Sequence, residues 1–260
     1  MKVVLFCGGE GLRLRDFSGS VPKPMVPVGY RPIMWHVMKY YAQFGHKDFI
    51  LCLGHHADVI KHYFLNYEEA VSNDFVLREG GRTKQMLKTD VEDWTITFVD
   101  TGLNAEIGER LLRVREHLAG EEMFLANYAD GLTDLDLDTY LEAFGASGRT
   151  GALLAVKPTL SYHVVSFDET GSPVDIGPIR SSGLWLNGGY FVFRQGVFSY
   201  LEKNDDLAAV LSSMVDDGEL FSFPHEGFWA PMDTFKDKSH LDAIWASGRR
   251  PWLRSETETG

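Results

Sequence analysis

Short apolar runs alternate with segments of helical spacing along the first half of the chain. Val3-Val4-Leu5-Phe6 is a continuous apolar run, typical of a strand that is buried on both faces of a parallel sheet. Residues 32–44 place apolar side chains every three or four positions, which predicts a helix. A second strand is expected at 48–53 and a second helix at 57–65. This alternation predicts an α/β fold with a doubly wound, mostly parallel (Rossmann-like) sheet.

The second half of the chain favours strands. Residues 67–93 carry mixed charge without clear periodicity and are interpreted as an insertion with hairpin character. Further strands are expected at 94–99, 123–127, 151–157, 162–167, 172–176 and 184–193. Further helices are expected at 108–118, 196–202, 206–216 and 235–247, with one more after Asp136. We expect a single domain over 1–252 and a frayed tail over 253–260.

Composition narrows the classes of partner. The 260 residues include 25 Lys and Arg against 37 Asp and Glu, so the net charge is −12. This balance argues against nucleic acid and against anionic membrane surfaces. Cys7 and Cys52 lie in apolar runs, which favours buried thiols in a reducing compartment. With no signal peptide and no apolar run of about 18 residues, we expect a cytoplasmic protein.

A glycine-rich segment, Gly8-Gly9-Glu10-Gly11, follows the first predicted strand. Ligands of parallel sheets bind beyond the carboxyl ends of the strands, and glycine lets backbone N–H groups approach a phosphate. The third glycine of a dinucleotide fingerprint is replaced by Leu14, and the P-loop lysine motif is absent. Arg13, Arg15 and Lys23 nevertheless place cations near this turn, which suits a polyphosphate. The alternative is a plain tight turn with solvated cations.

Two carboxylates are candidates for holding a metal. Asp130 follows the apolar strand 123–127, and Asp233 lies between an aromatic segment and the last helix. Carboxylates together with phosphates are the usual ligands of Mg²⁺. For each aspartate taken alone, the simpler interpretation is a helix cap or, for Asp130, a cap or a turn. Asp134, Asp136 and Asp138 are interpreted as charge at a helix N-terminus.

Taken in order, four motifs resemble the sugar-1-phosphate nucleotidyltransferases. They are Gly8-Gly9-x-Gly11-x-Arg13-Leu14, Pro22-Lys23-Pro24-Met25, Asp130 and Asn187-Gly188-Gly189. Segments 32–39, 186–192 and 227–234 are most similar to the glucose-1-phosphate cytidylyltransferase branch. The resemblance implies a nucleotidyltransferase (GT-A-like) fold, with a nucleotide-binding part over about 1–135 and a β-rich, acceptor-binding part over about 136–252.

The resemblance also implies substrates and residue roles. CTP and a sugar 1-phosphate would give a nucleotide sugar and pyrophosphate with Mg²⁺ as cofactor, in a homo-oligomer. Arg13 and Lys23 would be catalytic, and Asp130 and Asp233 would hold the metal. The nucleotide would contact Gly8, Gly9, Gly11, Thr101, Gly102, Arg110 and Tyr128. The acceptor would contact Asn187, Gly188 and Arg180.

Several positions depart from the family pattern, mostly on the acceptor side. Leu12 replaces a threonine, and Ala129 replaces the glycine before the metal-binding aspartate. Gly177 replaces the lysine that binds the sugar phosphate, and Arg180 is a candidate substitute. Three readings stay open: glucose 1-phosphate as acceptor, another phosphorylated acceptor, or a non-catalytic nucleotide-binding homologue.

Overall fold

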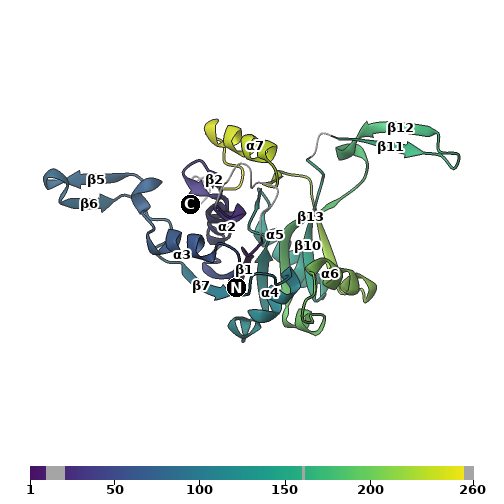
Figure 1. The fold of residues 1–260 in the computed structure, drawn as a ribbon, viewed down its shortest axis with the longest axis horizontal. Helices are drawn as coiled ribbons and strands as arrows, with labels where there is room; N and C mark the ends of the chain where they lie inside the picture. Colours follow the sequence, from purple (N-terminus) through teal and green to yellow (C-terminus); the bar gives the residue numbers. More distant parts are fainter. Residues whose placement is uncertain (10–20, 160–161, 255–260) are drawn as a thin grey trace.

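The computed structural model describes residues 1–9, 21–159 and 162–254, and its centre is a seven-stranded sheet (Figure 1). The strand order is β14-β10-β13-β8-β1-β4-β7. These strands are β1 (Lys2–Phe6), β4 (Asp48–Leu53), β7 (Thr95–Asp100), β8 (Met123–Asn127), β10 (Gly151–Val156), β13 (Leu186–Arg194) and β14 (Leu220–His225). Only β13 runs antiparallel to its neighbours, so the predicted doubly wound, mostly parallel sheet is confirmed.

Both faces of the sheet are covered by apolar layers. Val3 and Leu5 of β1 belong to one buried cluster, while Val4 and Phe6 belong to the other. Alternate residues of a strand face opposite sides, so a strand that is covered on both faces reads as a continuous apolar run. The helices of the first layer are α2 (Ile33–Ala42), α3 (Ala57–Leu65), α5 (Leu137–Ser147) and α7 (Phe235–Ala246). Those of the second are α4 (Ile107–Arg113) and α6 (Leu207–Asp216).

Several predicted elements differ from the structure. The helix expected at 108–118 ends at Arg113, because Val114 leaves helical geometry at φ −98° and ψ 4°, and a 3₁₀ turn η5 (Arg115–Leu118) follows. The helix expected at 196–202 is a 3₁₀ segment η7 (Gln195–Ser199). Strand β14 was not expected from the sequence. It contains Pro224, and the structure places it at the sheet edge, where proline is tolerated.

Two hairpins project from opposite ends of the molecule (Figure 1). One consists of β5 (Phe75–Arg78) and β6 (Thr83–Met86), which confirms the hairpin character expected for 67–93. The other consists of β11 (His163–Phe167) and β12 (Pro173–Pro178). Each is a separate two-stranded sheet with its own antiparallel pairing.

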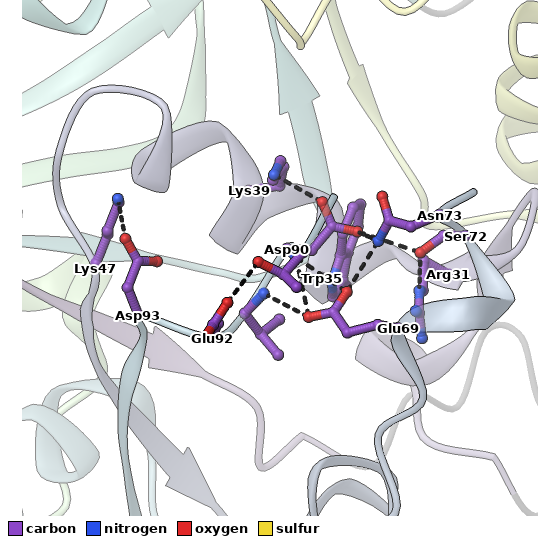
Figure 2. Close-up of polar contacts among 12 residues, drawn as sticks. Arg31, Trp35, Lys39, Lys47, Glu69, Ser72, Asn73, Asp90, Glu92 and Asp93 are labelled. Carbon is purple, nitrogen blue, oxygen red and sulfur yellow. Dashed lines mark hydrogen bonds and ion pairs between the residues drawn. The ribbon is translucent and has the colours of Figure 1, made fainter. Parts of the chain in front are cut away.

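A polar cluster joins the first hairpin to the body of the protein (Figure 2). The Asp90 carboxylate accepts from Lys39 of α2 at 2.8 Å and from the Asn73 amide at 2.6 Å. The Glu69 carboxylate accepts from the backbone N–H groups of Asp90 and Val91. A cavity of about 380 Å³ lies beside this cluster, between α2 and residues 89–94.

Two short ribbons lie outside the seven-stranded sheet. The first pairs β9 (Gly131–Thr133) with β15 (Trp229–Pro231), and the second pairs β2 (Pro27–Val28) with β3 (Arg31–Pro32). Neither ribbon was expected from the sequence, because strands of two or three residues leave no periodic signal. Among the described residues, no helix has the length and apolar character needed to cross a membrane.

Candidate active site

The site lies where the parallel strands end. The carboxyl ends of β1, β4, β7 and β8 and the amino end of the antiparallel β13 share one edge of the sheet. Gly8 and Gly9 follow β1, and Asp130 follows β8. In open α/β sheets this edge is where ligands bind. Gly11 and Arg13 lie outside the described residues.

The two candidate metal ligands meet at one ammonium group. Lys23, in the 3₁₀ turn η2 (Lys23–Met25), donates to Asp130 at 2.6 Å and also to Asp233. The side chains of Lys23 and Asp130 are 17% and 26% exposed, so the charges are largely shielded while one side stays open to solvent. Residues more than one hundred positions apart therefore form a single charged cluster.

Neither aspartate is used as a helix cap. Helix α7 is capped by Thr234, whose hydroxyl accepts from the Asp237 N–H in a capping box. Helix α5 is capped by Asp136, which accepts from the N–H groups of Asp138 and Thr139. Because other residues perform the capping, the carboxylates of Asp130 and Asp233 are left to face Lys23. The alternative of simple caps is therefore excluded.

The charge states in this cluster follow from burial and mutual attraction. Burial lowers the pKa of Lys23, but the carboxylates of Asp130 and Asp233 outweigh it and raise the pKa above its ordinary value. Burial raises the pKa of Asp130 above its ordinary value, although Lys23 partly opposes the shift. Lys23 is thus firmly cationic, and a cation beside Asp130 stabilises its ionised form.

The cluster fits a divalent cation of the hard, oxygen-binding kind. Two aspartate carboxylates that converge on one positive charge are a donor set suited to Mg²⁺, which completes its coordination with water and substrate phosphates. Within residues 1–9, 21–159 and 162–254, no group of three or more His, Cys, Asp or Glu side chains is placed to hold a metal.

Arg110 is buried and ties three strand ends together. One nitrogen of its guanidinium donates to the carbonyls of Leu53 and Gly102 and to the hydroxyl of Thr101, and the other donates to the Gly8 carbonyl at 3.1 Å. A Cβ atom at Gly8 would lie 2.1 Å from this guanidinium, so a side chain there would force the guanidinium out of these hydrogen bonds. Arg110 and Thr101 thus tie together the turns after β1, β4 and β7. Among the residues that the structure describes, none has an atom within 4 Å of a Cβ built at Gly9.

The expected acceptor residues divide into two groups. Asn187 at the start of β13 donates to the Tyr128 hydroxyl at 3.4 Å, and the Gly188 carbonyl accepts from Trp229 at 2.9 Å. Tyr128 lies two residues before Asp130, and Trp229 lies in the β9–β15 ribbon, whose strand β9 begins directly after Asp130. Gly177 and Arg180 instead lie in and just after β12 of the second hairpin, where both are solvent-accessible.

Comparison with known proteins decides the family. Residues 2–245 match the nucleotidyl transferase family. The chain belongs to this family. A glucose-1-phosphate cytidylyltransferase of Salmonella typhi is 37% identical over 261 residues, which cover 97% of this chain and 98% of that protein. The family and the enzyme class expected from the sequence are therefore confirmed.

Solved structures of two other transferases share the fold. A UDP-glucose pyrophosphorylase in complex with UDP-glucose has a TM-score of 0.69 at 14% identity and covers 95% of this chain and 99% of its own. The inositol-1-phosphate CTP transferase of T. maritima has a TM-score of 0.63 at 18% identity and covers 96% and 97%. At these identities the likeness establishes the architecture of this nucleotidyl transferase.

Two features of the nucleotidyl transferase site were missed at the level of sequence. Trp229 lies in a segment recognised as similar to the family, but its hydrogen bond to Gly188 depends on the β9–β15 ribbon. Lys157 follows β10, and its ammonium lies 3.7 Å from the centre of the Trp185 ring, a cation–π contact near Asn187. Only the pairing of β10 with β13 brings these residues together.

Proposed function

We propose that this nucleotidyl transferase moves a cytidylyl group from CTP to glucose 1-phosphate, which gives CDP-glucose and pyrophosphate. The observation that carries the proposal is the cluster of Lys23, Asp130 and Asp233 at the ligand-binding edge of the sheet. The choice of CTP and glucose 1-phosphate follows the name of the Salmonella typhi relative, which matches this chain over nearly its full length.

The reaction needs alignment and charge neutralisation more than a strong base. The second pKa of a phosphate monoester is about 6, so the acceptor is already an anion at neutral pH. One of its oxygens attacks the α-phosphorus of CTP, and the bond from that phosphorus to the oxygen bridging to the β-phosphate breaks. The electron pair leaves with pyrophosphate. The acceptor phosphate, the α-phosphate of CTP and the departing pyrophosphate are all anionic, and they must be held close together.

Lys23 is suited to the centre of that arrangement. Its raised pKa keeps the ammonium protonated, and it can exchange its carboxylate partners for phosphate oxygens. Asp130 and Asp233 would hold Mg²⁺, whose charge neutralises phosphate oxygens when it is bound. Arg13 is proposed to contact the departing phosphates.

The remaining proposed contacts surround this centre. Gly9 offers open backbone to the nucleotide, together with the expected contacts of Gly8, Gly11, Thr101, Gly102 and Tyr128. Arg110 is proposed to act by holding those turns in place, because its donors are already used by backbone carbonyls and Thr101. Asn187 and Gly188 are proposed to contact the sugar, and Arg180 its phosphate.

A product screen tests the proposal. Each of the four ribonucleoside triphosphates is incubated with Mg²⁺ and a panel of sugar phosphates and phosphorylated alcohols, and nucleotide products are separated by chromatography. CDP-glucose as the best product supports the proposal. A better phosphorylated acceptor would point to the alternative that Gly177 motivates. CTP binding by calorimetry with no product from any acceptor would instead indicate a non-catalytic homologue.

Removal of the Lys23 ammonium tests its central place. Lys23→Ala is expected to lower pyrophosphate release from CTP by on the order of 10²-fold or more, because one charge contact in a shielded site contributes several kcal/mol. The matched control is Lys47→Ala, which removes a lysine paired with Asp93 directly before β4, at the opposite end of this strand from the site, and should keep near-normal turnover. Equal activity of the two variants would exclude the proposed role of Lys23.

The proposal extends to cellular setting and assembly. Substrates of this class are small phosphorylated metabolites, so we place the enzyme in the cytoplasm. We also propose that it works as a homo-oligomer, because its hairpins carry exposed apolar side chains.

A further inference from the structure

The turn that carries Asp130 is held by contacts that the reaction itself does not explain. Residue Ala129 has φ +62°, a left-handed conformation that costs an L-residue about 1–2 kcal/mol. Its neighbour Asp130 must nevertheless aim a carboxylate at Lys23 and Asp233. A strained turn at this place requires surrounding contacts that fix it.

Asn127 fixes the first half of the turn. Its side-chain oxygen accepts from the Ala129 N–H at 2.7 Å, and its amide nitrogen donates to the Tyr41 hydroxyl at 3.2 Å. The Asn127 side chain is buried, so both of its polar ends need partners. The amide thus connects helix α2 to the residue directly before Asp130.

Tyr190 fixes the second half. Its hydroxyl donates to the Gly131 carbonyl at 2.8 Å, on the other side of Asp130. Tyr190 is the register partner of Asn127 across β13 and β8, and its ring packs on Tyr40 and Tyr41. Burial raises the pKa of Tyr190 well above its ordinary value, so the hydroxyl keeps its proton and remains a donor.

The backbone of Asp130 in turn places Asp233. The Asp130 carbonyl accepts from the Met232 N–H at 2.8 Å, directly before Asp233. The β9–β15 pairing of Gly131 with Pro231 continues this contact. A shift of the turn would therefore move both carboxylates.

We propose that Asn127 and Tyr190 are positioning residues, which hold the Ala129–Gly131 turn so that Asp130 and Asp233 present the geometry a divalent cation requires. This inference rests on the proposed function in assigning the two carboxylates to a metal. Neither residue touches the substrate in this proposal; each acts through backbone groups on either side of Asp130. Contacts of this kind beneath metal ligands are worth about 10- to 100-fold in metal affinity.

Tyr190→Phe and Tyr140→Phe provide a matched comparison. Both variants lose one buried tyrosine hydroxyl that donates to a backbone carbonyl, but the Tyr140 hydroxyl donates to Tyr190 at 3.3 Å and not to the turn. Both should lower the melting temperature by a few degrees, on the order of 3 °C. Only Tyr190→Phe should raise the Mg²⁺ concentration for half-maximal turnover, by about 10-fold, with turnover restored at high Mg²⁺.

Metal binding is also measured without turnover. Mn²⁺ is titrated into the protein in the presence of CTP and followed by electron paramagnetic resonance, with the Mn²⁺ bound to CTP alone subtracted. Tyr190→Phe should weaken Mn²⁺ binding by about 10-fold, and Tyr140→Phe by less than about twofold. Equal effects of the two variants, or no effect of Tyr190→Phe, would overturn the proposal.

Asn127 is tested in the same assay against Tyr41→Phe. Asn127→Ala removes the acceptor for Ala129, whereas Tyr41→Phe removes only the other partner of the amide. Asn127→Ala should weaken Mn²⁺ binding more than Tyr41→Phe; the reverse order would overturn the proposal for Asn127. If the parent enzyme binds Mn²⁺ but makes no CDP-glucose, the proposed function fails while the positioning proposal is still decided.

Discussion

At the scale of single residues, the conformation of Ala129 has a measurable cost. Ala129 and Ala126 are both buried alanines, but only Ala129 has a positive φ. Ala129→Gly relieves the left-handed strain and loses one methyl group. Ala126→Gly in strand β8 loses one methyl group and relieves no strain. We therefore expect Ala129→Gly to be more stable than Ala126→Gly by about 1–2 kcal/mol in urea unfolding. Equal losses of unfolding free energy in the two variants would contradict the backbone strain at Ala129.

Residue types predict chemistry better than they predict surroundings. That Asp130 would lie at a ligand-binding edge could be predicted, because it ends an apolar strand. The resemblance implied that Asp130 and Asp233 meet at one metal, but their direct contact with Lys23 could not be predicted, since it depends on ribbons of two or three residues. Arg110 was expected beside the nucleotide, and its burial beneath the turns could not be foreseen because arginine is rarely buried without a carboxylate.

At the scale of elements, helix α2 and the end of the chain are joined through His36. The ring is fully buried, its Nε2 donates to the Val28 carbonyl at 2.9 Å, and its Nδ1 accepts from Trp252 at 3.3 Å. Both bonds are made by the neutral ring. Burial lowers the pKa of His36 from 6.5 to about 4.

This pKa makes stability depend on pH in a defined window. Between pH 6.5 and 4 the unfolded chain binds a proton at His36 that the folded chain does not, so stability is complete above pH 6.5 and falls as pH drops towards 4. The loss is roughly 3 kcal/mol, from 1.36 kcal/mol per pKa unit. In urea unfolding at several pH values, His36→Gln should lose this part of the slope. An unchanged slope would contradict the assignment.

Long periodic elements were the most predictable ones. Helix α2 and strands β1, β4 and β8 follow their expected ranges closely, because apolar periodicity reports burial directly. Arg254 lies within the segment expected to fray, 253–260, and it makes tertiary contacts. Its N–H donates to Gln43, and its guanidinium lies 3.8 Å from the centre of the Phe44 ring. Gln43 and Phe44 directly follow α2, and a polar sequence does not report contacts of this kind.

At the scale of the whole molecule, the two hairpins carry exposed apolar side chains. On the second hairpin, Phe167, Val174 and Ile176 are each more than 60% exposed. A two-stranded hairpin is marginally stable alone in water, and contiguous apolar surface marks interaction sites. The expected homo-oligomer would cover this surface.

Light scattering with size-exclusion chromatography tests the assembly. The parent should have a mass that is a multiple of 29.3 kDa. Ile176→Lys should dissociate it, because a charge buried in an interface is costly. Val215→Lys on helix α6 replaces an apolar residue that is 60% exposed, against 69% for Ile176, and that lies far from the hairpin along the chain; it should leave the mass unchanged. A monomeric parent would contradict the prediction.

The bridge from Lys23 to Asp130 and Asp233 also bears on how the protein is handled. Two carboxylates that face each other without a counter-ion would repel and push the β9–β15 ribbon from its place. Here the chain supplies that counter-ion itself. Prolonged dialysis against a chelator is therefore expected to stop turnover while the melting temperature shifts by less than about 2 °C. Activity should return on adding Mg²⁺, without refolding. A large drop in the melting temperature would mean that the site depends on metal for its shape.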